Sequence, residues 1–293
     1  MKRQNTQIHL VGTLIQLRSV TSRRVRTASA LATCCILVLA CGMVHADGKK
    51  GIGNWACDPK VNAALHVTWW YDWWLTAKAQ IPGSEFVPQA WTYTDNDNSK
   101  FSDLLFQGIA QNKARYVLGY NEPDGSGAGH MTVAKALEGW PLLMKTGLPL
   151  GSPAAVHDDD AWMKAFMAGA AAKHYRVDFV CIHWYYLNAR YLLDYVDKIH
   201  KLYGKPIWIT EFCPVDWTGN GAITQRKAAE FVRQALPALN ARSYVQRYAW
   251  YSDPGMPYGP GCLFNKNGSL TIVGKAYSEE PPGSFTTGPI APK

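Results

Sequence analysis

The sequence predicts an α/β protein in which eight parallel strands, with helices between them, close into a single-domain (β/α)₈ TIM barrel. Its 293 residues suffice for one barrel or at most two ordinary domains. Eight short apolar or β-branched segments can be counted, and helical patterns separate the third to the eighth. Strands that alternate with helices indicate a parallel sheet, and eight such units favour a barrel over the competing doubly wound sheet.

The expected strands, in chain order, are 51–55, 66–70, 85–91, 116–121, 149–154, 177–185, 206–212 and 245–251. Helical patterns cover 101–114, 131–145, 161–175, 190–203 and 224–241, and in the first of these Leu104, Leu105 and Ile109 recur at helical spacing. The first two connections are short, which predicts short or irregular first helices.

The ends of the chain differ in composition from this core. Residues 1–46 are basic and then apolar (28–44), which is typical of a secretory signal peptide cut after Ala46. A lipoprotein-like box ending in Cys41 offers a second cut that would leave a lipid anchor there, and a retained membrane anchor is a further alternative. We expect an exported, secreted or periplasmic protein with a barrel over 47–278. Residues 279–293, rich in Pro and Gly, are expected to form a flexible tail.

Charge and cysteine usage exclude some classes of function. The formal net charge is +8, but six basic residues and no acidic ones lie in 1–46, so the remainder carries about +2 and no nucleic-acid footprint. A Cys57–Cys262 disulfide is compatible with a closed barrel, whereas Cys181 and Cys213 are expected to be buried free thiols. Cysteine and histidine spacings match no structural zinc motif, and we expect no metal, no cofactor and a monomer.

Two glutamates, Glu122 and Glu211, each end an apolar strand, the fourth and the seventh. Function in α/β barrels gathers where strands end. Strands four and seven face each other across the barrel mouth, so the two carboxylates can meet at the roughly 5–5.5 Å that glycoside hydrolysis with retention requires. Proximity of two carboxylates raises the pKa of one, as the acid requires. The sequence therefore predicts a retaining glycosidase.

Aromatic residues at strand ends fit a sugar-binding cleft, because sugar rings pack their C–H faces on aromatic planes. The tryptophans at or just after strand ends are Trp55, Trp69, Trp70, Trp73, Trp74, Trp91, Trp184, Trp217 and Trp250. Alternation along the sixth strand places His183 and Tyr185 on one face, from which both would reach the cleft.

A metal-dependent hydrolase that uses residues 157–160 (His-Asp-Asp-Asp) is a weaker alternative. The cluster directly precedes a helix, where aspartates cap the helix and favour its dipole.

Several segments together resemble glycoside hydrolase family 128, whose members cleave β-1,3-glucans. The most specific are Asn-Glu-Pro-Asp at 121–124 and Trp-Ile-Thr-Glu-Phe at 208–212, and the resemblance spans about 51–277. It implies that Glu122 is the acid/base and Glu211 the nucleophile, an order that the residues alone do not give. It further implies that Asn121 bonds the sugar 2-hydroxyl, Tyr185 bonds the nucleophile and Trp250 forms the floor beneath the sugar.

The sequence departs from this family at two places that shape substrate binding. The third strand ends in 89–93 (Gln-Ala-Trp-Thr-Tyr) instead of a Trp-Gly ending, and Asp72 stands where the family has Asn. The resemblance implies an endo-acting β-1,3-glucanase, although these departures bear on its linkage preference and its endo or exo mode. We expect Trp55, Trp69, Trp73 and Trp91 as further substrate contacts. Two alternatives stay open: a hydrolase of cellulose, mixed-linkage glucan or mannan, and a carbohydrate-binding barrel without turnover.

Overall fold

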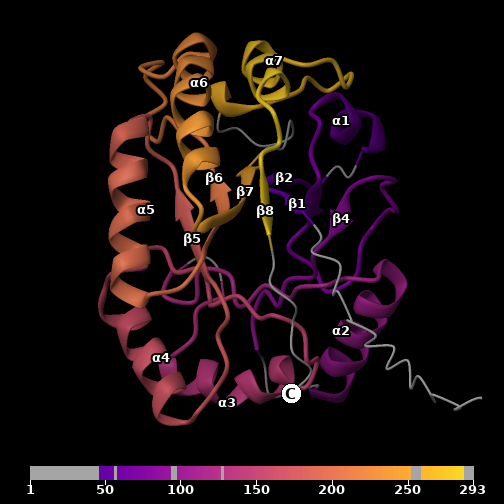
Figure 1. Cartoon of the computed structure of the whole chain (residues 1–293), viewed down its shortest axis with the longest axis vertical. Helices are drawn as coiled ribbons and strands as arrows, with labels where there is room; N and C mark the ends of the chain where they lie inside the picture. The colour runs from indigo at the N-terminus through magenta and orange to yellow at the C-terminus, as the bar shows by residue number, and fades with distance from the viewer. Residues whose placement is uncertain (1–45, 56–57, 94–97, 127–128, 252–258, 287–293) are drawn as a thin grey trace, which may run out of the picture. The chain divides into compact units, whose positions relative to one another are not determined.

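The computed structural model describes residues 46–293 except 56–57, 94–97, 127–128, 252–258 and 287–293 (Figure 1). The chain divides into two units, 1–42 and 43–293, and the described residues all belong to the second. The predicted signal peptide up to residue 45, the alternative anchor at Cys41 and the disulfide partner Cys57 lie outside the described residues. Within the described ranges, no helix is both long and apolar enough to cross a membrane.

Six parallel strands form a continuous sheet in the order β4-β3-β2-β7-β6-β5. In chain order they are β2 (Lys50–Gly53), β3 (Trp69–Tyr71), β4 (Glu85–Phe86), β5 (Val180–Trp184), β6 (Ile207–Phe212) and β7 (Val245–Tyr251). The first and last of these pair directly, since β2 lies beside β7. In Figure 1 β5, β6 and β7 lie next to one another, with α5 and α6 outside them.

The sheet closes between β4 and β5 through two segments that pair only at isolated points. Parallel bridges join Gln89 to Leu118, Val117 to Leu150, and Gly151 to Phe179. These residues belong to the expected strands at 116–121 and 149–154. All eight predicted strand positions therefore take part in one closed ring, which confirms the barrel.

Five helices lie where the periodicity predicts them, and two short helices, α1 at the start and α7 at the end, lie outside the predicted helical ranges. They are α1 (Pro59–Ala64), α2 (Asn98–Asn112), α3 (Val133–Met144), α4 (Ala161–Ala172), α5 (Ala189–Tyr203), α6 (Gln225–Ala241) and α7 (Ile272–Glu279). The side chains of Thr132, Asp160, Asn188 and Thr224 accept a backbone N–H in the first turn of α3, α4, α5 and α6. The first helix is short, as predicted, and no helix is described between β3 and β4.

Two apolar clusters fill the fold, one inside the barrel and one between the barrel and its helices. Inside, Trp69, Tyr116, Phe179 and Trp208 are buried together, and the rings of Phe179 and Trp208 stack at 4.2 Å. Outside the ring, Trp250 is fully buried against Phe212 of β6, Phe231 of α6 and Tyr277 of α7. Alternation along each strand sends successive side chains to these two clusters.

A short antiparallel pair joins the two ends of the described chain. β1 (Ala46–Gly48) pairs with β8 (Ser284–Thr286), and Phe285 of β8 belongs to the inner cluster. The prediction that 279–293 forms a flexible tail is therefore wrong for this part of the segment. Composition suggested a mobile linker, but Phe285 supplies an apolar anchor that the surrounding Pro, Gly and Thr residues obscure.

Candidate active site

Glu122 leaves the barrel at the end of the fourth strand position in an unusual backbone conformation. Its φ is +40°, a left-handed value that non-glycine residues rarely adopt. Its N–H donates to the Ala154 carbonyl at 2.7 Å, and its own carbonyl accepts the Gly125 N–H at 3.0 Å. Strained backbone of this kind occurs at functional sites, where the surrounding structure holds it in place.

Glu211 lies on β6 beside an irregularity of the sheet. The register between β6 and β7 shifts between Ile209 and Phe212, and β-bulges near active sites re-aim side chains. Trp208 and Glu211 thus both face inward, Trp208 at the base of the barrel and Glu211 above it. Glu211 is only 4% exposed, so its carboxylate depends on protein donors for solvation.

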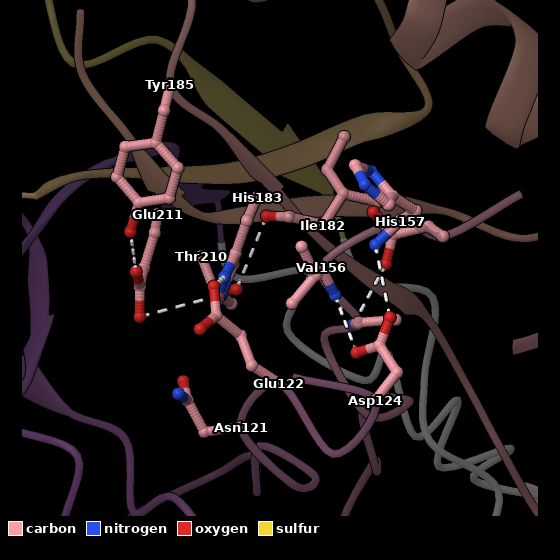
Figure 2. A network of polar contacts seen from close by, with 12 residues as sticks. Asn121, Glu122, Asp124, Val156, His157, Ile182, His183, Tyr185, Thr210 and Glu211 are labelled. Carbon is pink, nitrogen blue, oxygen red and sulfur yellow. Dashed lines mark hydrogen bonds and ion pairs between the residues drawn. The ribbon is translucent and has the colours of Figure 1, made fainter. Parts of the chain in front are cut away.

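His183 of β5 lies between the two carboxylates (Figure 2). Its Nδ1 is 3.0 Å from Glu122 Oε1, and its Nε2 is 3.6 Å from Glu211 Oε1. An oxygen of each carboxylate and a nitrogen of this ring all lie within 4.8 Å of one another. The two glutamates that the sequence singled out therefore meet, at a spacing compatible with the roughly 5–5.5 Å between carboxyl groups in retaining glycosidases.

The three groups share charge in a defined way. Burial alone would lower the pKa of His183, but the charges of Glu211 and Glu122 outweigh it and raise the pKa to about 9. Burial alone would raise the pKa of Glu122, but the hydrogen bond and charge of His183 hold it below its usual value. Both shifts favour the proton on the His183 imidazole over the Glu122 carboxylate.

Three side chains direct a hydrogen-bond donor at the Glu211 carboxylate. The Tyr185 hydroxyl donates to Oε2, as Figure 2 shows. The Trp73 indole N–H donates to Oε1 at 2.6 Å, and the Tyr71 hydroxyl is 3.3 Å from the same oxygen. The bond from Tyr185 agrees with the role that the family resemblance implied. The donors Trp73 and Tyr71 were not predicted, although their place at the end of the second strand was a usable signal.

The remaining predicted contacts divide into those that reach the cleft and those that do not. Asn121 is buried beside the catalytic pair and accepts a weak hydrogen bond from Gln89 at 3.4 Å. Trp55 and Trp91 are half-buried neighbours, with ring centroids 6.5 Å apart. These residues stay candidates for substrate contact.

Three predicted substrate contacts need correction. Trp69 has no exposed surface, and its indole N–H is bonded to the Lys49 carbonyl at the base of the barrel. Trp250 is also fully buried, because β7 turns it outward and turns its neighbour Tyr251 inward, where the Tyr251 ring meets those of Trp73 and Tyr185. Trp73 is 2% exposed, and its polar edge faces the nucleophile instead of a sugar.

Two cavities flank the catalytic pair. One, of about 340 Å³, is lined on the strand 2 and 3 side by residues that include Trp73, Trp74, Gln89 and Trp91. The other, of about 450 Å³, is lined by Glu122 and by residues of the following loops, including His157, Tyr186 and Trp217. Glu122 and His183 therefore face the second cavity directly, whereas the first cavity meets the site through Trp73, which donates to Glu211.

The aspartates at 158–160 have structural partners. Asp160 caps α4, and Asp159 pairs with Lys198. Asp158 is fully buried; its carboxylate accepts hydrogen bonds from the Ala155 N–H and the Tyr195 hydroxyl, and burial raises its pKa to about 8. The capping interpretation is therefore confirmed for Asp160, while Asp158 and Asp159 serve other structural contacts.

Two cysteines in the described part of the chain, Cys181 and Cys213, are free thiols. Cys181 and Cys213 are buried, as predicted, and Cys262 is half-buried. Burial raises the pKa of both buried thiols well above the usual value, so neither is a nucleophile at neutral pH.

Comparison with known proteins places this geometry in a family. The model of the family described as glycosyl hydrolase catalytic core matches residues 51–277. A curated relative, alkali-sensitive linkage protein 1 of Schizosaccharomyces pombe, is 29% identical over 250 residues. That match covers 79% of this chain but only 44% of the relative, so the chain spans less than half the length of that protein.

Solved structures of similar proteins cover nearly the whole barrel. A subgroup I endo-β-1,3-glucanase of glycoside hydrolase family 128 from Amycolatopsis mediterranei, in complex with laminaritriose, is 30% identical with a TM-score of 0.70, over 79% of this chain and 98% of that one. A subgroup II endo-β-1,3-glucanase from Sorangium cellulosum is 26% identical with a TM-score of 0.70, over 80% and 98%. A subgroup VII oligosaccharide-binding protein from Trichoderma gamsii is 26% identical with a TM-score of 0.61, over 79% and 92%. With a closed barrel and two facing glutamates on its fourth and seventh strand positions, the chain belongs to glycoside hydrolase family 128.

Proposed function

We propose that this protein is an endo-acting β-1,3-glucanase that cleaves its substrate with retention of configuration. The observation that carries the proposal is the group of Glu122, His183 and Glu211. One carboxylate oxygen of each glutamate and one ring nitrogen of His183 lie within 4.8 Å of one another, and Glu122 and His183 line a cavity. The similar enzymes from Amycolatopsis and Sorangium are endo-β-1,3-glucanases, which supports this substrate.

The environments of the two glutamates favour different roles. Glu211 accepts bonds from Tyr185 and Trp73 and has a side chain only 5% exposed, so its carboxyl group is held in one orientation, as a nucleophile requires. Glu122 has a side chain 26% exposed and lines a cavity, where it can meet the leaving oxygen. Glu211 attacks the anomeric carbon, Glu122 protonates the departing oxygen, and the same Glu122 then takes a proton from the incoming water.

The proton that Glu122 delivers is shared with His183. In the unliganded protein the shifts in pKa place that proton on the imidazole, 3.0 Å from Glu122 Oε1. A sugar bound in the cleft displaces water from Glu122, and loss of solvation favours its neutral form. The proton then moves along the existing hydrogen bond to the carboxyl group that donates it.

The two cavities give the cleft a direction. The cavity that contains Glu122 lies on the leaving-group side, because the acid must reach the departing oxygen. The cavity lined by Trp74 and Trp91 lies on the other side and receives the sugar that becomes attached to Glu211. Aromatic walls on both sides suit a polymer that is bound across the cutting point.

Two carboxamide variants test this proposal. Wild type should release reducing sugar from a linear β-1,3-glucan, with little release from mixed-linkage glucan or carboxymethylcellulose. Glu122→Gln and Glu211→Gln should each lose at least about a thousandfold in kcat on the polymer. An aryl β-glucoside with a good leaving group should restore measurable turnover only to Glu122→Gln, and added azide should accelerate that variant by attacking the glycosyl-enzyme.

A carbohydrate-binding barrel without turnover is the second candidate. It is favoured by one observation, the similarity to the oligosaccharide-binding protein from Trichoderma. Both catalytic carboxylates are present here, which favours the enzyme. Binding of β-1,3-linked oligosaccharides by calorimetry with no product after prolonged incubation would support the binding protein and contradict hydrolysis.

We also propose that the protein is exported and cut after Ala46. Support comes from Asp47, whose buried carboxylate pairs with Arg115 at 2.7 Å and accepts the Tyr116 hydroxyl at 2.9 Å. A cut at this point keeps Asp47 in the mature barrel. The intact mass of protein recovered from the periplasm or medium of a bacterial host should begin at Asp47. A lipid-modified Cys41 or an unprocessed chain would contradict this site.

A further inference from the structure

We infer that Trp73 is a positioning residue for the nucleophile, which it holds through its indole N–H, and is not a platform for the sugar. This inference rests on the proposed function, in which Glu211 attacks the anomeric carbon. Trp73 is buried to 2% exposure, and its Nε1 lies 2.6 Å from Glu211 Oε1. A buried indole donates one hydrogen bond only, and here that bond goes to the reacting carboxylate.

The donors around Glu211 divide its two oxygens between them. Tyr185 serves Oε2. The Tyr71 hydroxyl is 3.3 Å from Oε1 but has a nearer acceptor, the Thr210 carbonyl at 2.8 Å. Trp73 is therefore the closest donor to Oε1 among the described residues, and without it that oxygen would lack a short hydrogen bond.

The position of the indole is fixed by strain and by packing. Trp73 has φ +62°, and a bulky side chain in the left-handed region is a genuine exception. The ring stacks on Trp55 at 5.0 Å and meets the edge of Tyr251 at 5.5 Å. Beneath it Gly53 leaves just enough room, since a Cβ there would lie 3.2 Å from the Trp73 ring.

The turn that carries Trp73 is itself held by a buried carboxylate. Asp72, with no exposed surface, accepts the backbone N–H of Lys78 at 3.3 Å, and the Trp74 carbonyl accepts the Gln89 N–H at 3.0 Å. These bonds fix the segment on both sides of Trp73. These hydrogen bonds offset the cost of the positive φ at Trp73. The indole N–H is therefore directed at Glu211 before any substrate binds.

The chemical consequence concerns the orientation of Glu211. The hydrogen bond from the Trp73 indole N–H to Oε1 restricts rotation of the carboxylate, so the nucleophile is aimed before the sugar binds. This effect acts on the rate at which the glycosyl-enzyme forms, and it requires no contact between the indole and the sugar.

Trp73→Phe tests the inference, with Trp70→Phe as the matched control. Trp70 lies on β3, three residues before Trp73, and faces the outer cluster, where its indole N–H is buried without a hydrogen-bond partner among the described atoms. On linear β-1,3-glucan we expect Trp73→Phe to lower kcat about 10- to 100-fold with little change in KM. Trp70→Phe should leave both kcat and KM close to the wild-type values.

A second measurement needs neither turnover nor a stable Trp73 variant. The assigned ¹H–¹⁵N resonance of the Trp73 indole should lie far downfield in wild type and move upfield in Glu211→Gln, whose amide is a weaker acceptor. A rise in KM alone in Trp73→Phe, or an indole resonance unchanged by Glu211→Gln, would overturn the inference. Absence of hydrolysis by wild type would contradict the proposed function, whereas the resonance tests the bond independently.

Discussion

At the scale of single residues, the protonation of His183 links the catalytic site to stability. Its pKa is raised to about 9 in the folded protein from 6.5. A raised pKa contributes stability that is complete below the unfolded value and is lost as pH rises through the folded one. We therefore expect the Tm of wild type to fall between about pH 6.5 and 9 by more than that of His183→Asn.

Thermal melts of both proteins across this range measure the effect, and His157→Asn provides a control at an exposed loop position. Each pKa unit corresponds to about 1.4 kcal/mol, so a loss of a few kcal/mol at most is expected. Parallel curves for wild type and His183→Asn would show that the imidazole is not cationic between the two carboxylates.

Single residues could be predicted where the local pattern was strong. Glu122, Glu211 and Tyr185 were found because a polar group at the end of an apolar barrel strand lies at the face where active sites form. The errors at Trp69 and Trp250 have one physical cause. Position near a strand end does not say which face a side chain takes, and each of these rings is buried in a different layer.

At the scale of elements, two loops of the cleft are tied together by Asp124. Its carboxylate accepts the backbone N–H groups of Val156 and His157 at 2.8 and 3.4 Å (Figure 2). Both loop residues line the leaving-group cavity. These hydrogen bonds join the loop after the fourth strand position, which carries Glu122, to the loop after the fifth. They therefore fix the position of Glu122 relative to the wall of the cavity.

Loss of this tie should affect long substrates most. We expect Asp124→Ala to lower kcat/KM on linear β-1,3-glucan about tenfold, since hydrogen bonds to a charged group contribute about 1.5–3 kcal/mol. An aryl β-glucoside, which places no sugar in that cavity, should be affected much less. Asp124→Asn retains one oxygen that can accept a hydrogen bond, so its kcat/KM on linear β-1,3-glucan should lie between the values of wild type and Asp124→Ala. Equal losses on both substrates would mean that Asp124 acts on Glu122 itself.

Element boundaries show where sequence reasoning loses detail. Periodicity placed α2 to α6 within a few residues, and α3, α5 and α6 each have a capping residue at the start. The eight-residue α7 was not predicted, because so short a helix shows little periodicity. The fourth and fifth strand positions are joined to their neighbours only by single bridges, which apolar content cannot distinguish from a full ladder. The register shift in β6 that aims Glu211 is likewise a property of pairing, and one strand alone does not encode it.

At the scale of the whole molecule, a buried charge cluster supports the base of the barrel. Arg247, 1% exposed, pairs with Glu85 and lies 3.9 Å from Asp47, and its guanidinium lies over the Trp208 and Tyr116 rings, 4.6 Å from each centroid. Removing one partner of a buried ion pair leaves an uncompensated charge.

We expect Arg247→Met to lower the free energy of unfolding by about 3 kcal/mol, measured by urea denaturation. Arg190→Met is the control, since Arg190 forms an exposed pair with Asp194 and exposed pairs contribute little. Equal stabilities of the two variants would show that the neighbouring Arg115 compensates both carboxylates by itself.

The antiparallel pair of β1 and β8 makes the two ends of the described chain part of one fold. The Pro282 carbonyl accepts the backbone N–H groups of Lys49 and Lys50 at 3.0 and 3.1 Å, and the buried Lys50 ammonium donates to the Tyr277 carbonyl at 2.9 Å and to that of Glu280. Phe285 adds a ring that is 6% exposed.

Removal of residues 280–293 should therefore destabilise the whole barrel and not merely shorten a linker. Burial of one phenylalanine contributes about 1.5–3 kcal/mol, and each lost backbone hydrogen bond about 1 kcal/mol, so we expect a loss of at least about 3 kcal/mol in urea denaturation. A chain ending at Thr286 keeps every one of these contacts and should match wild type, while Phe285→Ala should lose only the apolar share. If wild type, the chain ending at Thr286 and the chain ending at Glu279 all unfold at the same urea concentration, the β1–β8 pair contributes nothing to stability. A loss of stability confined to the chain ending at Glu279 would instead show that the segment 280–286, despite its linker-like composition, is part of the fold. This segment would then help to hold Asp47, Arg247 and the strands beneath the active site together.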